Sequence, residues 1–196
     1  MGGDAVKILI YYSPFEDPNL NDIKHAFVER IGSECEDIQI PFFLEFVGYD
    51  PKGGDEKGLE YAKIKPQVVI GSMTEFTKPH YKVDVLKVEV PVNANYVEGS
   101  SVFKGQVAQT KQEAMDLYRQ AADVTDKPFI YLSAGVSNAE FNESLALAAD
   151  AGTAVGSALG CHAHVSTKRR PAGSPPKPTG TMTTPTGSVA RISGAA

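Results

Sequence analysis

The stretch that decides the fold is VDVLKVEVPV, residues 83–92. Its β-branched and apolar residues predict a strand, the most clearly marked in the chain. Side chains two positions apart point to the same face of a strand, so Val83, Val85, Lys87 and Glu89 share one face. The sequence therefore places a lysine and a glutamate side by side in an otherwise apolar strand.

The rest of the first 150 residues alternates between short apolar runs and longer amphipathic stretches. Such alternation predicts parallel strands joined by helices. Pro66 is expected to begin a second helical piece inside its helix, and a capping box opens the third helix. The expected strands cover residues 5–12, 41–47, 83–92, 129–132 and, less clearly, Thr153–Leu159; the expected helices cover 22–33, 57–76, 110–124 and 139–151.

Two architectures fit this order, a doubly wound sheet and part of a (β/α)8 TIM barrel. Three successive strands each carry an ionisable residue on one face: Lys7, Glu45 and Lys87. A doubly wound sheet would press these side chains into packed helices at a cost of several kcal/mol each, whereas a barrel has an interior where they can meet. No glycine-rich nucleotide-binding motif follows the first strand. The barrel is therefore the favoured architecture.

The composition describes an ordinary globular chain of 196 residues, 42% hydrophobic and 22% charged. The net charge of −5 argues against binding to nucleic acid or to an anionic membrane. No apolar run reaches the length of a membrane span, and the first residues do not resemble a secretory signal. With only two cysteines, the sequence predicts a cytoplasmic protein without a disulfide framework.

The last part of the chain has a different composition. All 24 acidic residues lie at or before Asp150, and residues 161–196 are rich in Pro, Gly, Ser and Thr. Such a segment buries too little apolar surface to offset the entropy lost on ordering. The expected organisation is a partial barrel at 1–160 and a disordered tail at 161–196.

Several motifs resemble the tagatose-1,6-bisphosphate aldolase family, in the same order and at similar spacing. They are AVKILIYY (5–12), ERIGSEC (29–35), IPFFLEF (40–46), VDVLKVEVPVN (83–93), YVEG (96–99) and PFIYLSAGVS (128–137). The family fold is a (β/α)8 barrel, so the resemblance implies an incomplete barrel with strands 4 to 7 and part of strand 8. Where the family has an arginine-bearing eighth strand this chain reads GSALGCHAHV (156–165), which suggests a frame-shifted or mis-spliced 3′ end.

The resemblance also implies the chemistry. Lys87 would form a Schiff base with the substrate ketone, Lys7 would be a second active-site lysine, and Glu45 would be the acid/base residue. Glu89 is the competing carboxylate, expected to hold Lys87 or Lys7 in place. A phosphate of the substrate would meet the turn formed by Ser133, Ala134 and Gly135, as barrel loops after the seventh strand commonly bind phosphate. Neither a metal nor a cofactor is expected, because the imine replaces the Lewis acid.

Two functions follow as hypotheses. The first is a class I aldolase that cleaves a phosphorylated ketose, such as tagatose 1,6-bisphosphate, to glycerone phosphate and glyceraldehyde 3-phosphate. The second is a catalytically inactive partial barrel that binds sugar phosphate weakly or only a protein partner. An open partial barrel exposes sheet edges and apolar faces, so a homo-oligomer is also possible.

Overall fold

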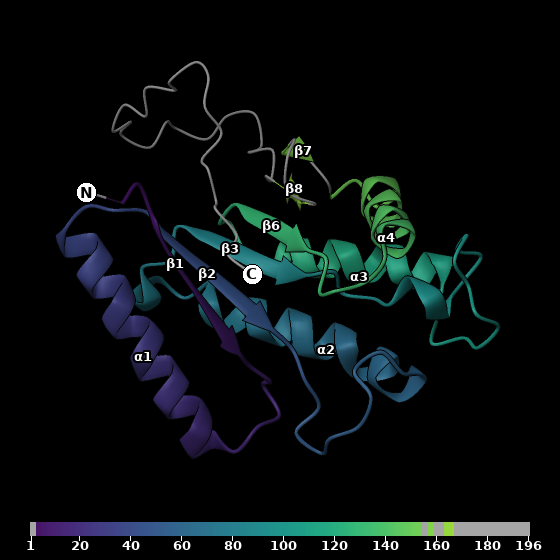
Figure 1. Ribbon diagram of the computed structural model, residues 1–196, viewed down its shortest axis with the longest axis horizontal. Coiled ribbons are helices and arrows are strands. Elements are labelled where there is room, and N and C mark those ends of the chain that lie inside the picture. Colours follow the sequence, from purple (N-terminus) through teal and green to yellow (C-terminus); the bar gives the residue numbers. More distant parts are fainter. Residues whose placement is uncertain (1–2, 154–156, 159–162, 167–196) are drawn as a thin grey trace.

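The fold is built on a parallel four-stranded sheet (Figure 1). The structure, a computed structural model, describes residues 3–153, 157–158 and 163–166. Each strand pairs in parallel with the next along the chain. These four strands are β1 (Val6–Tyr11), β2 (Phe42–Val47), β3 (Val85–Glu89) and β6 (Phe129–Leu132).

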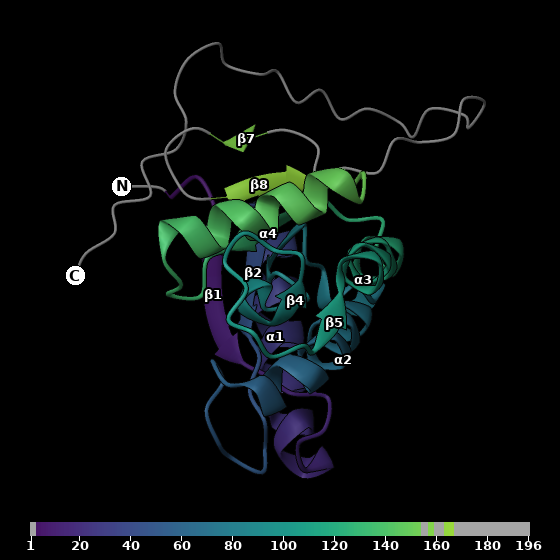
Figure 2. The same ribbon diagram turned by 90° about the vertical axis from the view of Figure 1, so that its right-hand side faces the viewer.

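The helices follow the strands in the same order, as Figure 1 shows from left to right. Figure 2 views the molecule from the end at which the last two helices lie. A short ribbon of β4 (Val97–Glu98) and β5 (Gln109–Thr110) precedes the third helix. The helices are α1 (Pro18–Asp37), α2 (Leu59–Phe76), α3 (Lys111–Asp123) and α4 (Asn138–Asp150), with 3₁₀ turns at Pro79–Tyr81 and Ala94–Tyr96.

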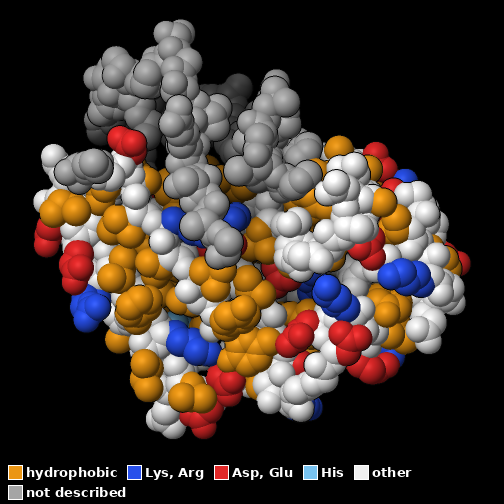
Figure 3. Space-filling view, viewed as in Figure 1, with side chains coloured by type: hydrophobic (Ala, Val, Ile, Leu, Met, Phe, Trp, Pro, Cys, Tyr) orange, Lys and Arg blue, Asp and Glu red, His pale blue; other side chains and the backbone are white. Residues whose placement is uncertain are grey.

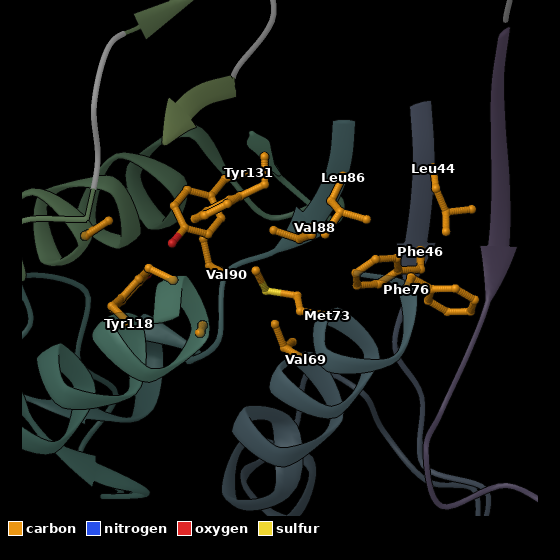
Figure 4. Packing of buried hydrophobic residues seen from close by; sticks show 14 of the residues in the cluster. Leu44, Phe46, Val69, Met73, Phe76, Leu86, Val88, Val90, Tyr118 and Tyr131 are labelled. Atoms are coloured by element: carbon orange, nitrogen blue, oxygen red, sulfur yellow. The ribbon is translucent and has the colours of Figure 1, made fainter. Parts of the chain in front are cut away.

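One face of the sheet forms the hydrophobic core with the helices. Side chains from β2, β3 and β6 pack there against Phe76 and Met73 of α2 and Tyr118 of α3 (Figure 4). The Phe46 and Phe76 rings lie 5.6 Å apart, and the Tyr118 and Tyr131 rings meet edge to face at 5.9 Å. Each helix of this row contributes buried side chains to the same cluster.

The opposite face carries the polar strand residues and is open along β1. Leu9 and Tyr11 on that face are 45% and 64% exposed. Figure 3 shows hydrophobic side chains gathered over β1 and α1. Helices packed on one face of a parallel sheet are the arrangement of a (β/α) barrel wall, in which the other face lines the interior. The fold is therefore an incomplete barrel, and the doubly wound alternative does not apply.

α1 begins earlier than predicted, at Pro18 instead of Asp22. The Asp17 side chain caps it by accepting a hydrogen bond from the Asn19 backbone N–H at 2.8 Å. Proline suits the first turn because its missing N–H would have no partner there. Both signals were local and readable in the sequence.

α2 runs through Pro66 without a break, so the predicted second helical piece was wrong. A proline inside a helix leaves the carbonyl four residues earlier without its usual donor. That carbonyl belongs to Ala62, and it accepts a hydrogen bond from the side-chain amide of Gln109 at 3.0 Å. A distant side chain thus replaces the missing helical hydrogen bond.

The third helix, the strand at 129–132 and the fourth helix agree with the prediction, whereas the short ribbon of β4 and β5 was not predicted. The Thr110–Glu113 capping box, the strand at 129–132 and the Ser137 cap are all present. Beyond them the sheet gains two antiparallel strands, β8 (Ala163–Ser166) beside β6 and β7 (Ser157–Ala158) beside β8.

β8 corrects one part of the prediction for the tail. Residues 163–166 form a strand, because the outer edge of β6 offers backbone groups to pair with. Residues 167–196, and with them most of the predicted disordered tail, lie outside the described part of the chain. The same holds for 154–156 and 159, which belong to the predicted strand at 153–159.

Within the described residues, no helix combines the length and apolar character needed to cross a membrane.

Candidate active site

Three ionisable side chains from neighbouring strands meet on the inner face of the sheet. The Glu45 carboxylate lies between two ammonium groups: its Oε2 is 2.6 Å from Lys7 Nζ, and its Oε1 is 3.1 Å from Lys87 Nζ. The pairing register places Glu45 directly opposite Lys87. The structure therefore brings the three predicted catalytic residues together.

Exposure differs within this group. The Glu45 side chain is 8% exposed, whereas those of Lys7 and Lys87 are 43% and 31% exposed. The amines can thus be reached from the open face, while the carboxylate that joins them is buried. Burial raises the pKa of Glu45, but the hydrogen bonds from Lys7 and Lys87 outweigh it and leave that pKa below its ordinary value. Glu45 is therefore an ionised carboxylate at neutral pH, able to accept a proton.

Glu89 does not hold Lys7 or Lys87, so that part of the prediction was wrong. Its Oε1 lies 3.4 Å from the ammonium of Lys65 on α2, and its Oε2 accepts a hydrogen bond from the Gly48 N–H at 2.7 Å. Lys65 and Glu89 are both almost fully buried. Glu89 joins the end of β2 to the end of β3 and to a helix, so it fixes the two strands that carry Glu45 and Lys87.

A pocket of about 210 Å³ opens at the carboxyl ends of the strands. It lies next to the Lys7, Glu45 and Lys87 group on the same face, because the lining residues Val47 and Glu89 are each two residues past Glu45 and Lys87. This is the end of the sheet at which TIM-barrel enzymes place their active sites. The lining includes the last residues of β1, β2 and β3, which are Tyr11, Val47 and Glu89. It also includes residues of α2 and α4 and of the loops, among them Gly48, Glu56, Lys57, Tyr61, Lys65, Val90, Asn93, Ser133, Ala134 and Glu140.

The predicted phosphate-binding turn lies at this pocket. Ser133 and Ala134 line it, and the turn is closed by a hydrogen bond from the Val136 N–H to the Ser133 carbonyl at 3.1 Å. Ala134 and Gly135 have φ values of 50° and 70°, a left-handed conformation that glycine adopts without strain. The Gly135 carbonyl faces the Lys57 ammonium at 3.5 Å.

Comparison with known proteins identifies the chain. A family model described as "DeoC/LacD family aldolase" matches residues 1–166. The chain belongs to this family.

Relatives in the DeoC/LacD family show how much of the sequence is shared. "Tagatose 1,6-diphosphate aldolase 2" of Enterococcus faecalis is 53% identical over 152 residues, which are 78% of this chain and 45% of that protein. "Tagatose 1,6-diphosphate aldolase" of Listeria monocytogenes serotype 4a is 54% identical over 147 residues, 75% of this chain and 43% of that protein. The Streptococcus pneumoniae serotype 4 aldolase of the same name is 49% identical over 151 residues, 77% and 46% of the two chains. This chain therefore spans less than half the length of these curated relatives.

Two residues near the site of this DeoC/LacD chain, Lys65 and Lys57, were not predicted from the sequence. Lys65 is a buried partner of Glu89, although a lysine in a helix usually lies in solvent. Lys57 reaches the pocket from the loop before α2. Neither residue lies in a strand or in one of the motifs on which the resemblance rests, so no local pattern marked them.

Proposed function

We propose that this chain carries the catalytic centre of a class I aldolase that cleaves tagatose 1,6-bisphosphate or a related ketose phosphate. The products would be glycerone phosphate and glyceraldehyde 3-phosphate. The observation that carries the proposal is the Glu45 carboxylate held between Lys7 and Lys87 on the open face of the sheet. Family membership and the printed names of the relatives support the same chemistry.

The first step joins the enzyme to the substrate. The Lys87 ammonium first gives a proton to Glu45, and the neutral amine attacks the C2 carbonyl of the ketose. The resulting carbinolamine loses water to give a protonated imine. Loss of water requires a proton donor within hydrogen-bond reach. Lys7 and Glu45 together supply this proton, because the Lys7 ammonium donates to Glu45 at 2.6 Å.

The second step breaks the C3–C4 bond. The Glu45 carboxylate removes the proton of the C4 hydroxyl, an aldehyde forms at C4, and the bonding electrons move to the imine nitrogen as an enamine. Glyceraldehyde 3-phosphate leaves, Glu45 gives the proton it removed to C3 of the enamine, and hydrolysis of the imine releases glycerone phosphate. The turn at Ser133–Gly135 would hold a phosphate during these steps.

No metal ion has a role in this proposal. Among residues 3–153, 157–158 and 163–166, no group of three or more His, Cys, Asp or Glu side chains is arranged to hold a metal. The absence of a metal or cofactor requirement stays a prediction, as does the absence of nucleic-acid and membrane partners.

Trapping with borohydride tests the proposal. Borohydride reduces an imine between Lys87 and glycerone phosphate to a stable secondary amine, which peptide mass mapping locates. We expect an adduct on Lys87 that disappears in Lys87→Ala and forms about 10²–10⁴ times more slowly in Glu45→Gln. A folded chain that gives no adduct, beside a relative of full length that does, would refute the proposal.

The inactive alternative rests on the open sheet. β1 is an edge strand of the sheet, and Leu9 and Tyr11 are exposed on its inner face. An unpaired edge strand beside apolar surface is a common site of association with another chain. Sedimentation velocity distinguishes the two proposals when combined with trapping: an oligomer without adduct favours the binding role, whereas a monomer with adduct favours the aldolase.

A further inference from the structure

Among the described residues that line the pocket, Lys57 is the lysine without a carboxylate partner. Lys65 pairs with Glu89, and Lys104 lies 3.4 Å from Glu140. Lys57 also lines the pocket, yet no carboxylate of a described residue lies within 4 Å of its ammonium group. Its ammonium contacts the Gly135 carbonyl at 3.5 Å, a long and therefore weak hydrogen bond. We infer that Lys57 supplies the positive charge that holds a phosphate group of the substrate at the pocket.

The backbone at Lys57 is held in place by two hydrogen bonds. Its N–H donates to the Asp55 carboxylate at 2.9 Å, and its carbonyl accepts from the Asn93 side-chain amide at 3.4 Å. The second bond ties the loop before α2 to the loop after β3. The lysine stem therefore starts from a fixed point and reaches across to the turn after β6.

That turn offers the remaining groups that a phosphate needs. Ser133 lines the pocket, and its hydroxyl makes no hydrogen bond to another described residue. A hydroxyl, backbone N–H groups and an ammonium group together match the oxygen atoms and the charge of a phosphate. The Lys57 ammonium already lies against this turn at the Gly135 carbonyl, so an anion bound beside them would contact both loops.

Other nearby charges do not replace Lys57. Lys7 and Lys87 both face Glu45, which neutralises part of their charge. Glu140 stays ionised, because hydrogen bonds from Asn95 and Ser137 lower its pKa to about 2. Glu56, on the rim, is a further negative group. Lys57 is therefore the group that attracts an anion to this pocket electrostatically.

The inference rests on the proposed function, and trapping can separate the two. We would measure how the rate of borohydride labelling of Lys87 depends on ketone concentration, once with glycerone phosphate and once with unphosphorylated glycerone. Lys57→Gln removes the charge and Lys57→Arg keeps it. Lys52→Gln is the matched control, since Lys52 is an exposed lysine of the same loop that does not line the pocket.

We expect Lys57→Gln to raise the half-saturating concentration of glycerone phosphate about tenfold. Labelling by unphosphorylated glycerone should not change, Lys57→Arg should keep most of the affinity, and Lys52→Gln should behave as the wild type. High salt should reduce the difference between the wild type and Lys57→Gln, because ions screen an exposed charge.

Two results would overturn the assignment. One is equal behaviour of Lys57→Gln and Lys52→Gln with glycerone phosphate; the other is an equal loss with both ketones, which would mean that Lys57 only supports the loop. If the wild type forms no adduct at all, the proposed function fails instead. Calorimetry of glycerone phosphate binding then decides on Lys57, and equal affinities of the wild type and Lys57→Gln refute its role.

Discussion

The buried ion pair of Lys65 and Glu89 holds the carboxyl ends of β2 and β3 together, and its removal should be costly. The two side chains are 9% and 6% exposed and 3.4 Å apart. Removing one partner of a buried pair costs about 3–5 kcal/mol, because the other charge stays buried without compensation. In Lys65→Met, Glu89 keeps its hydrogen bond from the Gly48 N–H, so we expect the lower end, about 3 kcal/mol.

The double variant separates the pair from its surroundings. Glu89→Gln keeps an oxygen for Gly48 but leaves the Lys65 ammonium unpaired, so it should also cost about 3 kcal/mol. Lys65→Met combined with Glu89→Gln leaves no unpaired buried charge. Its cost should not exceed that of either single change, which gives a coupling energy of about 3 kcal/mol.

Urea unfolding followed by circular dichroism measures these free energies. Thermal unfolding should show the single variants about 6–12 °C below the wild type, at about 2–4 °C per kcal/mol for a chain of this size. Lys63→Met is the control, because Lys63 pairs with Glu60 on the surface of the same helix and exposed pairs contribute less than about 1 kcal/mol. Additive single costs, or a Lys65→Met cost equal to that of Lys63→Met, would refute the reasoning.

Two further changes test other parts of the fold. Gly32→Ala in α1 should lower the free energy of unfolding by about 2 kcal/mol in urea titrations, because a Cβ there would lie 2.0 Å from the Tyr81 carbonyl oxygen. This loss should outweigh the better helix propensity of alanine. Unchanged stability would contradict the close packing at Gly32. Burial lowers the pKa of His25 despite the nearby Glu75 and Asp22 carboxylates, so the folded state binds its proton less readily than the unfolded state does. Neutral His25 therefore makes its full contribution to the free energy of unfolding above the ordinary histidine pKa of about 6.5. This contribution is lost as the pH falls below that value. The wild type should therefore lose more stability than His25→Gln between pH 7 and pH 5.5, and parallel losses in the two proteins would exclude this linkage.

The meeting of Lys7, Glu45 and Lys87 on one face was predictable because strand periodicity is simple. A period of two places Lys7, Glu45 and Lys87 on the inner face once the strands are parallel. The sequence could not say which glutamate meets the lysines, because that depends on the register between strands. Glu45 lies opposite Lys87, whereas Glu89 lies nearer the carboxyl end and meets Lys65.

Contacts between distant elements account for the other differences. Pro66 suggested a break in α2, and only the Gln109 amide, which lies far along the chain, shows why the helix continues. Lys65 lies on a helix, where lysine normally indicates solvent, and its partner Glu89 lies on a strand. The early start of α1 is different in kind, since Asp17 and Pro18 were local signals that could have been used.

The placement of Lys7, Glu45 and Lys87 on three adjacent strands would also make the proposed imine chemistry a reporter of correct folding. A shift of β1 by one residue against β2 would turn Lys7 to the helix-covered side and bring an apolar neighbour to the inner face. Such a misfolded chain would keep its secondary structure, so circular dichroism could not distinguish it from the native one. The extent of imine formation would distinguish the two states. It would measure the fraction of molecules in a preparation that have the native strand register.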